Sequence, residues 1–303
     1  MRSRNSVALK AYAKLNLGLR VIGRRKDGFH ELRTIYQTIS LADHLEVCLA
    51  SGPPAVSLEA SGIEAPPGRQ NLAVRAAEAV LRELNLRRKV TVFLRKRIPS
   101  GSGLGGGSSD AAAVMRAVLH LAGKKMPADR LLALAASLGS DVPFFLLGGR
   151  ALGIGRGEEV YPLQEEPRRY CVLLYPGRSM DTATAYRRLR APLLTSPATR
   201  HTIELFCGSV NKAVWHRLGN DFEPVVFSAF RGLAAVKRSL LRSGAVMASL
   251  TGSGSVVFGV FEDYSQAQTA ARRLRRPGAD VFVARTVSRR ELQDPLPGIV
   301  TAK

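Results

Sequence analysis

The chain has 303 residues, of which 46% are hydrophobic and 23% are charged, and its formal net charge at pH 7 is +21. This length and apolar fraction predict a globular protein with one large core or two smaller ones, and they exclude global disorder. We find no apolar run long enough to span a bilayer and no signal peptide in the basic N-terminal segment. The three cysteines, Cys48, Cys171 and Cys207, lack metal-type spacing, which favours a protein of the reducing cytoplasm.

The positive charge comes mostly from arginine and is spread over the whole chain. Short basic clusters occur, but none forms a low-complexity tail or alternates with aromatic residues. Charge alone supports only non-specific attraction to nucleic acid. We therefore expect the charge to attract small anionic substrates. We predict no nucleic-acid or membrane partner, and a monomer or weak dimer.

Residues 7–22 alternate between apolar and polar side chains, which predicts one long strand or two strands with one face on a core. The apolar positions are Val7, Leu9, Ala11, Ala13, Leu15, Leu17, Leu19 and Val21. Lys14 and Asn16 have the other parity and should project side by side from the opposite face. A lysine on a strand usually lies in solvent, so the alternation by itself gives Lys14 no function.

The rest of the first half mixes strands and helices. We predict a turn at Arg24–Gly28, strands at Thr34–Ile39, His44–Leu49 and Val90–Leu94, a surface loop around a short strand over Ser51–Pro67, and helices at Asn71–Leu84, from Ser108 or Ser109 to about Leu121, and at Ala128–Leu138. The second of these helices is apolar nearly all round, so we expect it to be buried.

The sequence pattern of the second half of the chain predicts a different arrangement of strands and helices. Strands are expected at Tyr170–Tyr175 and Asp280–Val287, helices near Thr182–Arg190, Gly208–Leu218, Phe230–Ser243 and Ser265–Arg275, and a hairpin of Val246–Leu250 and Ser255–Phe261. This order suggests a ferredoxin-like α+β layer. Gly153, Gly155 and Gly157 precede an acidic, Pro-containing stretch, so we place a domain boundary there, dividing the chain into residues 1–160 and 161–303.

A glycine-rich segment, IPSGSGLGGGSSDAAA at residues 98–113, leads straight into the buried helix. Backbone amides in such a loop can converge on an anion, and the helix N-terminus adds partial positive charge. A polyphosphate such as ATP is the natural ligand. The alternative is a Gly-rich surface linker without a binding function. The strand before this segment and the buried helix after it argue against a linker.

Three phosphate-loop patterns compete for this segment. The P-loop requires a lysine after its last glycine, and none follows here. Gly101, Gly103 and Gly106 match the dinucleotide fingerprint, but the ribose-binding acid expected about twenty residues on is not at a strand end. The third pattern is Pro-x-x-x-Gly-Leu-Gly-x-Gly-Ser-Ser-x-Ala-Ala, which residues 99–112 fit at every defined position. That pattern resembles the GHMP kinases, which act on galactose, homoserine, mevalonate and phosphomevalonate.

Six further segments resemble one branch of this superfamily, whose substrate is a cytidine-diphosphate-linked sugar alcohol of isoprenoid precursor synthesis. They are AYAKLNLGL (11–19), RKDGFHEL (25–32), QNLAVRAA (70–77), LGSDVPFF (138–145), NDFEP (220–224) and LTGSGSVVF (250–258). The resemblance implies an α+β protein with the two-domain GHMP kinase fold. An N-terminal mixed α/β domain would bind ATP, a C-terminal ferredoxin-like domain would follow, and both substrates would occupy the cleft between them.

The resemblance also implies a catalytic pair, Lys14 and Asp141. An alcohol is a poor nucleophile, so a carboxylate should take its proton during attack on the γ-phosphorus, and a lysine can hold that carboxylate ionised. Asp141 also suits a helix N-cap before Pro143, and the residues alone leave these two interpretations about even.

The remaining site residues follow from the same resemblance. The expected ATP-binding positions are Pro99, Ser100, Gly101, Ser102, Gly103, Leu104, Gly105, Gly106, Gly107, Ser108, Ser109, Asn71 and Lys96, with Mg²⁺ as the nucleotide's counterion. The expected substrate-binding positions are Asn16, Phe29, His30 and Thr182. Ser108 and Ser109 could instead cap the helix, Lys96 could be solvated, and His30 could serve a structural hydrogen bond.

The chain departs from the branch pattern at Phe29, where tyrosine is usual, so stacking on a base would survive without a phenol hydrogen bond. Two other classes of function remain open on the sequence: a basic nucleic-acid-binding protein and a non-catalytic ATP-binding regulator. The function that we expect is ATP-dependent phosphorylation of a hydroxyl group on the cytidine-diphosphate sugar alcohol.

Overall fold

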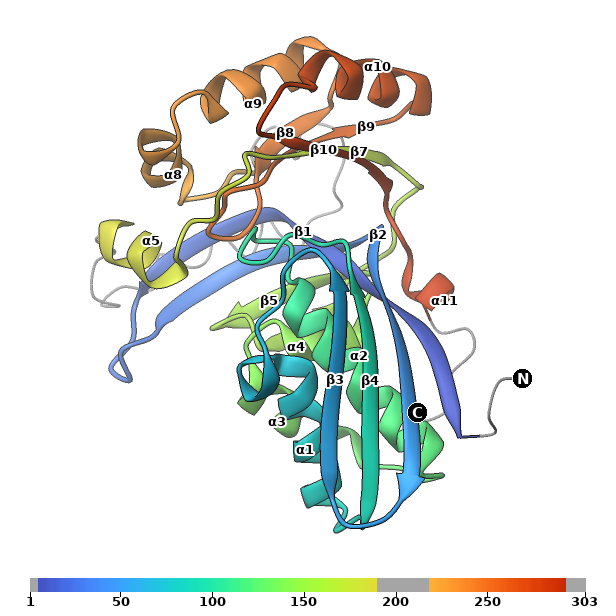
Figure 1. Cartoon of the computed structure of the whole chain (residues 1–303). Helices are drawn as coiled ribbons and strands as arrows, with labels where there is room; N and C mark the ends of the chain where they lie inside the picture. The colour runs from blue at the N-terminus through green and yellow to red at the C-terminus, as the bar shows by residue number, and fades with distance from the viewer. Residues whose placement is uncertain (1–4, 190–217, 293–303) are drawn as a thin grey trace.

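The computed structural model describes residues 5–189 and 218–292. Within these ranges the chain forms two sheets, each covered by helices, with the long strands of the first sheet running between the two halves (Figure 1). The helix predicted over 208–218 lies outside the described residues, apart from Leu218.

The first sheet contains β1 (Ser6–Arg24), β2 (His30–Ser51), β3 (Ala55–Gly62), β4 (Arg88–Lys96), β5 (Arg150–Gly155) and β6 (Glu159–Pro162). Among the described strands its order is β3-β4-β2-β5-β6, with β1 paired to β2. The helices around it are α1 (Leu72–Glu83), α2 (Gly106–Leu121), α3 (Ala128–Leu138) and α4 (Val142–Leu147), preceded by the short helix η1 (Gly68–Gln70).

The second sheet contains β7 (Tyr170–Tyr175), β8 (Met247–Leu250), β9 (Val257–Phe261) and β10 (Asp280–Arg285). Its order is β10-β7-β9-β8, all neighbours are antiparallel, and this is the order that a ferredoxin-like layer requires. The helices of this half are α5 (Thr182–Leu189), α8 (Glu223–Ala229), α9 (Leu233–Arg242), α10 (Tyr264–Leu274) and α11 (Arg289–Leu292), of which α9 and α10 cover the outer face of the sheet (Figure 1). The predicted fold class is confirmed.

Strand β2 corrects one prediction. The two strands expected at 34–39 and 44–49 are a single strand, because β1 continues to pair with β2 across the segment between them. The register shifts there: Tyr12 pairs with Ala42 and Ala13 pairs with Ile39, which leaves two β2 residues without a partner on β1. Such an irregularity breaks the alternation of the sequence without ending the strand. The short strand expected near 51–67 is β3, which pairs parallel with β4.

The apolar side chains of β1 pack into three separate cores, whereas the alternation predicted a single one. Its first apolar side chains, including Ala11, pack with α1 and α2. From Ala13 to Leu17 they pack against the inner face of the second sheet, and Leu19 joins the core beneath α9 and α10. The change of partner falls at the register shift after Tyr12. Strand β1 therefore connects the halves, and the polar side chains in its middle face the space between them.

Helix α2 is buried along most of its length, as expected. Its small side chains Ala111, Ala112 and Ala113 allow close packing against α1 and β1. Close packing on both sides fixes the N-terminus of α2, where the glycine-rich segment ends, relative to the middle of β1.

Candidate active site

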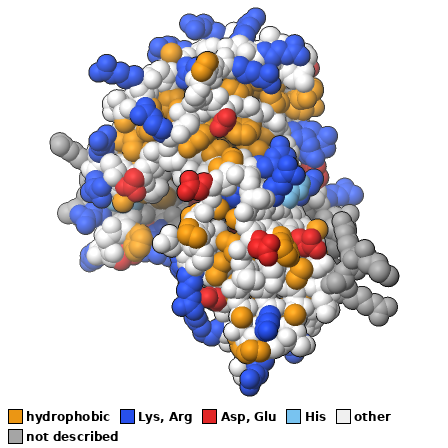
Figure 2. All heavy atoms as spheres, viewed as in Figure 1, with side chains coloured by type: hydrophobic (Ala, Val, Ile, Leu, Met, Phe, Trp, Pro, Cys, Tyr) orange, Lys and Arg blue, Asp and Glu red, His pale blue; other side chains and the backbone are white. Residues whose placement is uncertain are grey.

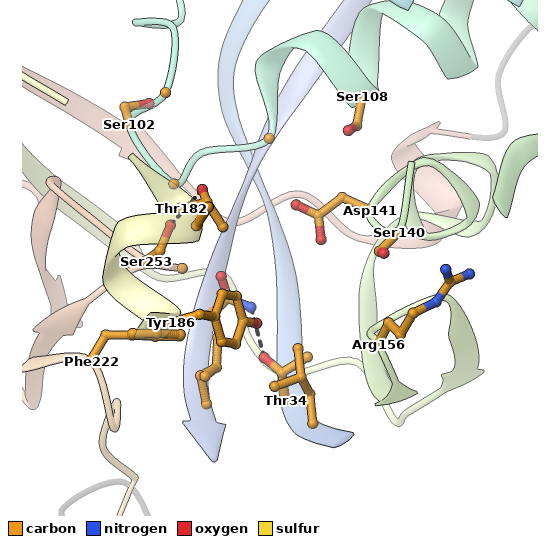
Figure 3. Close-up of a pocket in the computed structure, with 18 of the residues that line it drawn as sticks. Thr34, Ser102, Ser108, Ser140, Asp141, Arg156, Thr182, Tyr186, Phe222 and Ser253 are labelled. Atoms are coloured by element: carbon orange, nitrogen blue, oxygen red, sulfur yellow. Dashed lines mark hydrogen bonds between the residues drawn. The ribbon is translucent and has the colours of Figure 1, made fainter. Parts of the chain in front are cut away.

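A cleft of about 1210 Å³ opens where the two halves meet. It is lined by the second half of β1, the first residues of β2, the glycine-rich segment, the start of α4, helix α5 and the β8–β9 loop (Figure 3). Of the predicted site residues, those that line it are Lys14, Asn16, Phe29, His30, Pro99, Ser100, Gly101, Ser102, Gly103, Gly105, Gly106, Gly107, Ser108, Asp141 and Thr182. Residues from position 14 to position 182 thus meet in one cavity.

The glycine-rich segment follows β4 and ends where α2 begins at Gly106. It is held against β1 by a hydrogen bond from the Lys14 amide to the Leu104 carbonyl, at 3.0 Å. Gly103 has a φ of +85°, and a Cβ there would lie 2.1 Å from the Thr251 carbonyl oxygen. A Cβ on Gly105 would lie 2.7 Å from the Phe145 ring. Only glycine fits these two positions, and the first amides of α2 lack intrahelical acceptors, which suits an anion.

Lys14 and Asp141 lie together on the wall facing this loop. The Lys14 Nζ is 3.4 Å from the Asp141 Oδ2, and the ammonium is almost fully buried. It donates to the Asn16 Oδ1 at 2.6 Å, so the two alternate residues of β1 do project side by side. Asp141 occupies the N-cap position of α4, yet its side chain makes no capping hydrogen bond. Its carboxylate points into the cleft, toward the wall that carries Thr182 and Ser253 (Figure 3).

Asn16 connects this pair to the second half of the chain. Its Nδ2 donates to the Thr34 hydroxyl at 2.7 Å, and its backbone amide donates to the Thr251 hydroxyl at 3.0 Å. The Thr251 hydroxyl also lies 3.2 Å from the Gly103 carbonyl oxygen. The loop after β8 therefore contacts both Asn16, beside Lys14, and the glycine-rich segment, which fixes their separation.

Aromatic and basic side chains gather at the other end of the cleft. His30 stacks on Tyr186 of α5, with ring centroids 4.5 Å apart, and the Arg156 guanidinium lies 4.8 Å from the centroid of the half-exposed Phe29 ring. Partial burial, with help from the Arg24 charge, lowers the pKa of His30, so its imidazole is neutral at pH 7. A neutral imidazole offers one donor and one acceptor to a flat heterocycle. Thr182 and Ser253 lie side by side on the wall opposite Asp141, with their hydroxyl oxygens hydrogen-bonded at 3.0 Å (Figure 3).

Four predicted ATP-side residues do not line the cleft. Leu104 is fully buried in the core between the sheets, and Ser109 is buried within α2. Asn71 caps α1 by accepting from the Ala73 amide at 2.9 Å, and its Nδ2 donates to the Pro66 carbonyl at 3.1 Å. The side-chain amide of Asn71 is therefore hydrogen-bonded to the local backbone, and a role of Asn71 in binding ATP stays a prediction.

Lys96 lies behind the glycine-rich segment, in a buried cluster of charges. Its ammonium donates to Asp43 of β2 and, at 2.9 Å, to Asp110 in the first turn of α2. The other Asp43 oxygen accepts the backbone amides of Arg97 and Ile98. Burial by itself would lower the pKa of Lys96, but the charges and hydrogen bonds of Asp43 and Asp110 have the larger combined effect and raise that pKa. Burial also raises the pKa of Asp110 to about 7. The cluster ties both ends of the segment together.

Replacing Lys96 with methionine should lower the free energy of unfolding by about 3–5 kcal/mol, because it leaves two buried carboxylates without their shared cation. Urea denaturation measures the loss, with an unchanged m-value. Lys89→Met, at an exposed position on the same strand, is the matched control and should change stability by less than about 0.5 kcal/mol. Equal effects of the two substitutions would contradict this account of the cluster.

Sequence reasoning missed several residues of the cleft, among them Tyr36, Arg156 and Tyr186. Tyr36 pairs with Asn16 across the strands, but the sequence does not specify the register that results from the irregularity in β2. Thr251, which contacts Asn16, lies in LTGSGSVVF (250–258), one of the segments that carry the family resemblance. Figure 3 shows Tyr186 and Arg156 on opposite sides of the cleft, which no local pattern predicts.

Comparison with known proteins agrees with this geometry. The chain matches the family models for the GHMP kinases N terminal domain, over residues 71–149, and the GHMP kinases C terminal, over residues 209–280. A 4-diphosphocytidyl-2-C-methyl-D-erythritol kinase of Solibacter usitatus is 48% identical over 84% of this chain and 81% of its own length. The enzyme of the same name from Geobacter sulfurreducens is 38% identical over 93% of this chain and 99% of its own length.

Solved structures give the same result. A crystal structure of 4-(cytidine 5'-diphospho)-2C-methyl-D-erythritol kinase superposes with a TM-score of 0.74 at 37% identity, covering 92% of this chain and 99% of that one. Homoserine kinase from Cytophaga hutchinsonii superposes with a TM-score of 0.71 at 19% identity, covering 94% and 96%, and shares the fold. The fold and the cleft thus define a GHMP kinase. Within that class the chain belongs to the family of the 4-diphosphocytidyl-2-C-methyl-D-erythritol kinases.

Proposed function

We propose that this protein transfers the γ-phosphoryl group of ATP to the 2-hydroxyl of 4-diphosphocytidyl-2-C-methyl-D-erythritol, a step of the non-mevalonate isoprenoid pathway. The observation that carries the proposal is the meeting of Lys14, Asp141 and the glycine-rich segment in one cleft, with the two charged groups 3.4 Å apart. Membership of the family supplies the identity of both substrates.

In the proposed reaction the backbone amides of residues 102–108 hold the β- and γ-phosphates at the start of α2. The Asp141 carboxylate accepts the proton of the 2-hydroxyl while the oxygen of that hydroxyl forms a bond to the γ-phosphorus. The bond from that phosphorus to the β-γ bridging oxygen breaks, and ADP leaves. Lys14 pairs with the Asp141 carboxylate and stabilises the negative charge on the transferring group. A positioned base supplies about 10²- to 10⁴-fold in rate.

The donors near the phosphate end of the cleft are compatible with Mg²⁺. Ser108 and Ser140 offer hydroxyl oxygens there, and Mg²⁺ prefers oxygen ligands while keeping waters and binding substrate phosphates. Among the described residues there is no cluster of three acidic, histidine or cysteine side chains that could hold a metal. Ser108 would therefore hold a metal bound chiefly by the nucleotide, and the ion would neutralise phosphate charge.

The cytidine end of the substrate should bind where His30, Phe29 and Tyr186 lie. Stacking on an aromatic ring and a hydrogen bond to neutral His30 suit a pyrimidine base. Phe29 can provide the stack without a phenol. Asn16 and Thr182 line the path between this end and the glycine-rich segment, so they would contact the diphosphate or the sugar alcohol.

No feature of residues 5–189 and 218–292 favours a different partner. Figure 2 shows Lys and Arg side chains spread over the upper and lower parts of the molecule instead of gathered into one stripe. No helix in the described part of the chain is long and apolar enough to cross a membrane. The monomeric or weakly dimeric state and the cytoplasmic location stay predictions.

An ADP-release assay with alternative acceptors tests the proposed function. We expect kcat/KM with 4-diphosphocytidyl-2-C-methyl-D-erythritol to exceed that with homoserine, mevalonate or galactose by roughly 10⁴-fold, because the aromatic and polar groups of the nucleoside end would stay unpaired with the smaller alcohols. Faster turnover of any of the three alcohols would overturn the assignment. A parallel assay with Asp141→Asn excludes a contaminating kinase.

A further inference from the structure

Tyr36 is a buried tyrosine whose hydroxyl reaches the proposed base. Its side chain is 2% exposed, and its phenol oxygen lies 3.0 Å from the Asp141 Oδ1 and 3.3 Å from the Gly157 carbonyl oxygen. A phenol has one hydrogen to donate. The carboxylate is both the closer acceptor and the charged one, so it takes the stronger bond.

The Tyr36 ring is fixed from three sides. It stacks on Phe144 of α4, with ring centroids 4.6 Å apart. A Cβ on Gly153 would lie 2.4 Å from the ring, and a Cβ on Gly157 would lie 2.4 Å from the phenol oxygen. These two glycines, which mark a boundary in the sequence, thus make room for the tyrosine. Because Phe144 lies three residues after Asp141, the stack also fixes Tyr36 relative to the start of α4.

The two oxygens of Asp141 therefore have different partners. Oδ1 accepts from Tyr36, and Oδ2 faces the Lys14 ammonium at 3.4 Å. No capping bond restrains the carboxylate, although it occupies the N-cap position. Without the phenol, Lys14 would be the one side chain in the described part of the chain left to limit rotation of the carboxyl group, and Lys14 is also bonded to Asn16.

We propose that Tyr36 is a positioning residue for catalysis: its hydroxyl fixes the Asp141 carboxylate so that the other oxygen faces Lys14 and the incoming hydroxyl. This inference rests on the proposed role of Asp141 as the base. Burial, with the Asp141 charge beside it, raises the pKa of Tyr36, so the phenol stays protonated and remains a donor at neutral pH. A buried donor with one charged acceptor and a clamped ring is suited to orientation.

Tyr36→Phe tests the inference, because it removes only the hydroxyl and keeps the ring that packs on Phe144. We expect kcat to fall about tenfold, the size expected for one hydrogen bond to a charged group, while KM for ATP and for the cytidine substrate changes less than about twofold. Tyr161→Phe is the matched control, since Tyr161 is half-exposed on β6 and bonds to Glu159 outside the cleft. An unchanged kcat in Tyr36→Phe would overturn the proposal.

A double-mutant cycle separates positioning from a general structural role. The residual rate of Asp141→Asn, measured at high enzyme concentration, should not fall further when Tyr36→Phe is added, because the group that the phenol orients no longer accepts a proton. The same tenfold loss in both backgrounds would show a structural effect and refute the inference. Full turnover in Asp141→Asn would instead refute Asp141 as the base, so the two failures are distinguishable.

Discussion

Asp141→Asn should lower turnover by about 10³-fold while ATP still binds with an affinity within about threefold of the unsubstituted protein. The amide has the size of the carboxylate and can still accept a hydrogen bond from Tyr36, but it cannot take the proton of the acceptor alcohol. The glycine-rich segment is held by Lys14, Thr251 and the core, so the phosphate site should keep its shape. ADP release measures turnover, and calorimetry with a non-hydrolysable ATP analogue measures affinity.

The control for this variant is Asp129→Asn, an exposed acidic residue in the first turn of α3. It makes the same chemical change at a residue that does not line the cleft and should leave turnover within a factor of two. If Asp141→Asn turns over at the normal rate, Asp141 is not the base. If it loses ATP affinity as well as turnover, its main effect is on the nucleotide site.

The second large effect is expected from Gly103→Ala. A Cβ at this position would lie 2.1 Å from the Thr251 carbonyl oxygen, a backbone atom that cannot move aside like the end of a flexible side chain. The φ of +85° adds strain of about 1–2 kcal/mol for a residue with a Cβ. The glycine-rich segment must therefore shift away from the β8–β9 loop. A displacement of about 1 Å in a group that aligns reactants costs roughly 10²-fold in rate, so kcat/KM for ATP should fall by about that factor.

Gly219→Ala provides the comparison, because the nearest heavy atom to its added Cβ is the end of the Arg20 side chain, at 3.6 Å. We expect it to retain nearly normal kinetics. Thermal unfolding of both variants shows whether the protein remains folded. Normal kcat/KM for ATP in a folded Gly103→Ala protein would show that the contact with Thr251 does not define the phosphate site.

Much of the fold could be predicted from local sequence patterns. The helix at 128–138 and the strand at 170–175 have the predicted bounds, and the hairpin around residues 251–254 is present. The order of strands and helices in the second half also predicts the ferredoxin-like layer, which the sheet order confirms. These features depend on periodicity and turn residues within a few positions, where a single sequence is most informative.

In the candidate site, too, local features could be predicted from the sequence and long-range contacts could not. The glycine-rich segment and the spacing of Lys14 and Asn16 are local patterns, and the structure places both on the cleft. The partners of Lys96 and the hydroxyl of Tyr36 are not local, because each contact joins residues brought together by the pairing of β2 with its neighbours. The resemblance predicted that Lys96 binds ATP, whereas in the structure its ammonium donates hydrogen bonds to the buried carboxylates of Asp43 and Asp110.

By itself the sequence determined the family, through its motifs, and it located the glycine-rich segment and the face of β1 that carries Lys14, since glycine spacing and side-chain alternation act over short distances. Only the tertiary structure decided that Asp141 lies 3.4 Å from Lys14, that Tyr36 reaches Asp141 and that Thr251 contacts Gly103. Those contacts depend on strand register, and the irregularity in β2 shifts the register by an amount that the broken alternation of the sequence does not specify.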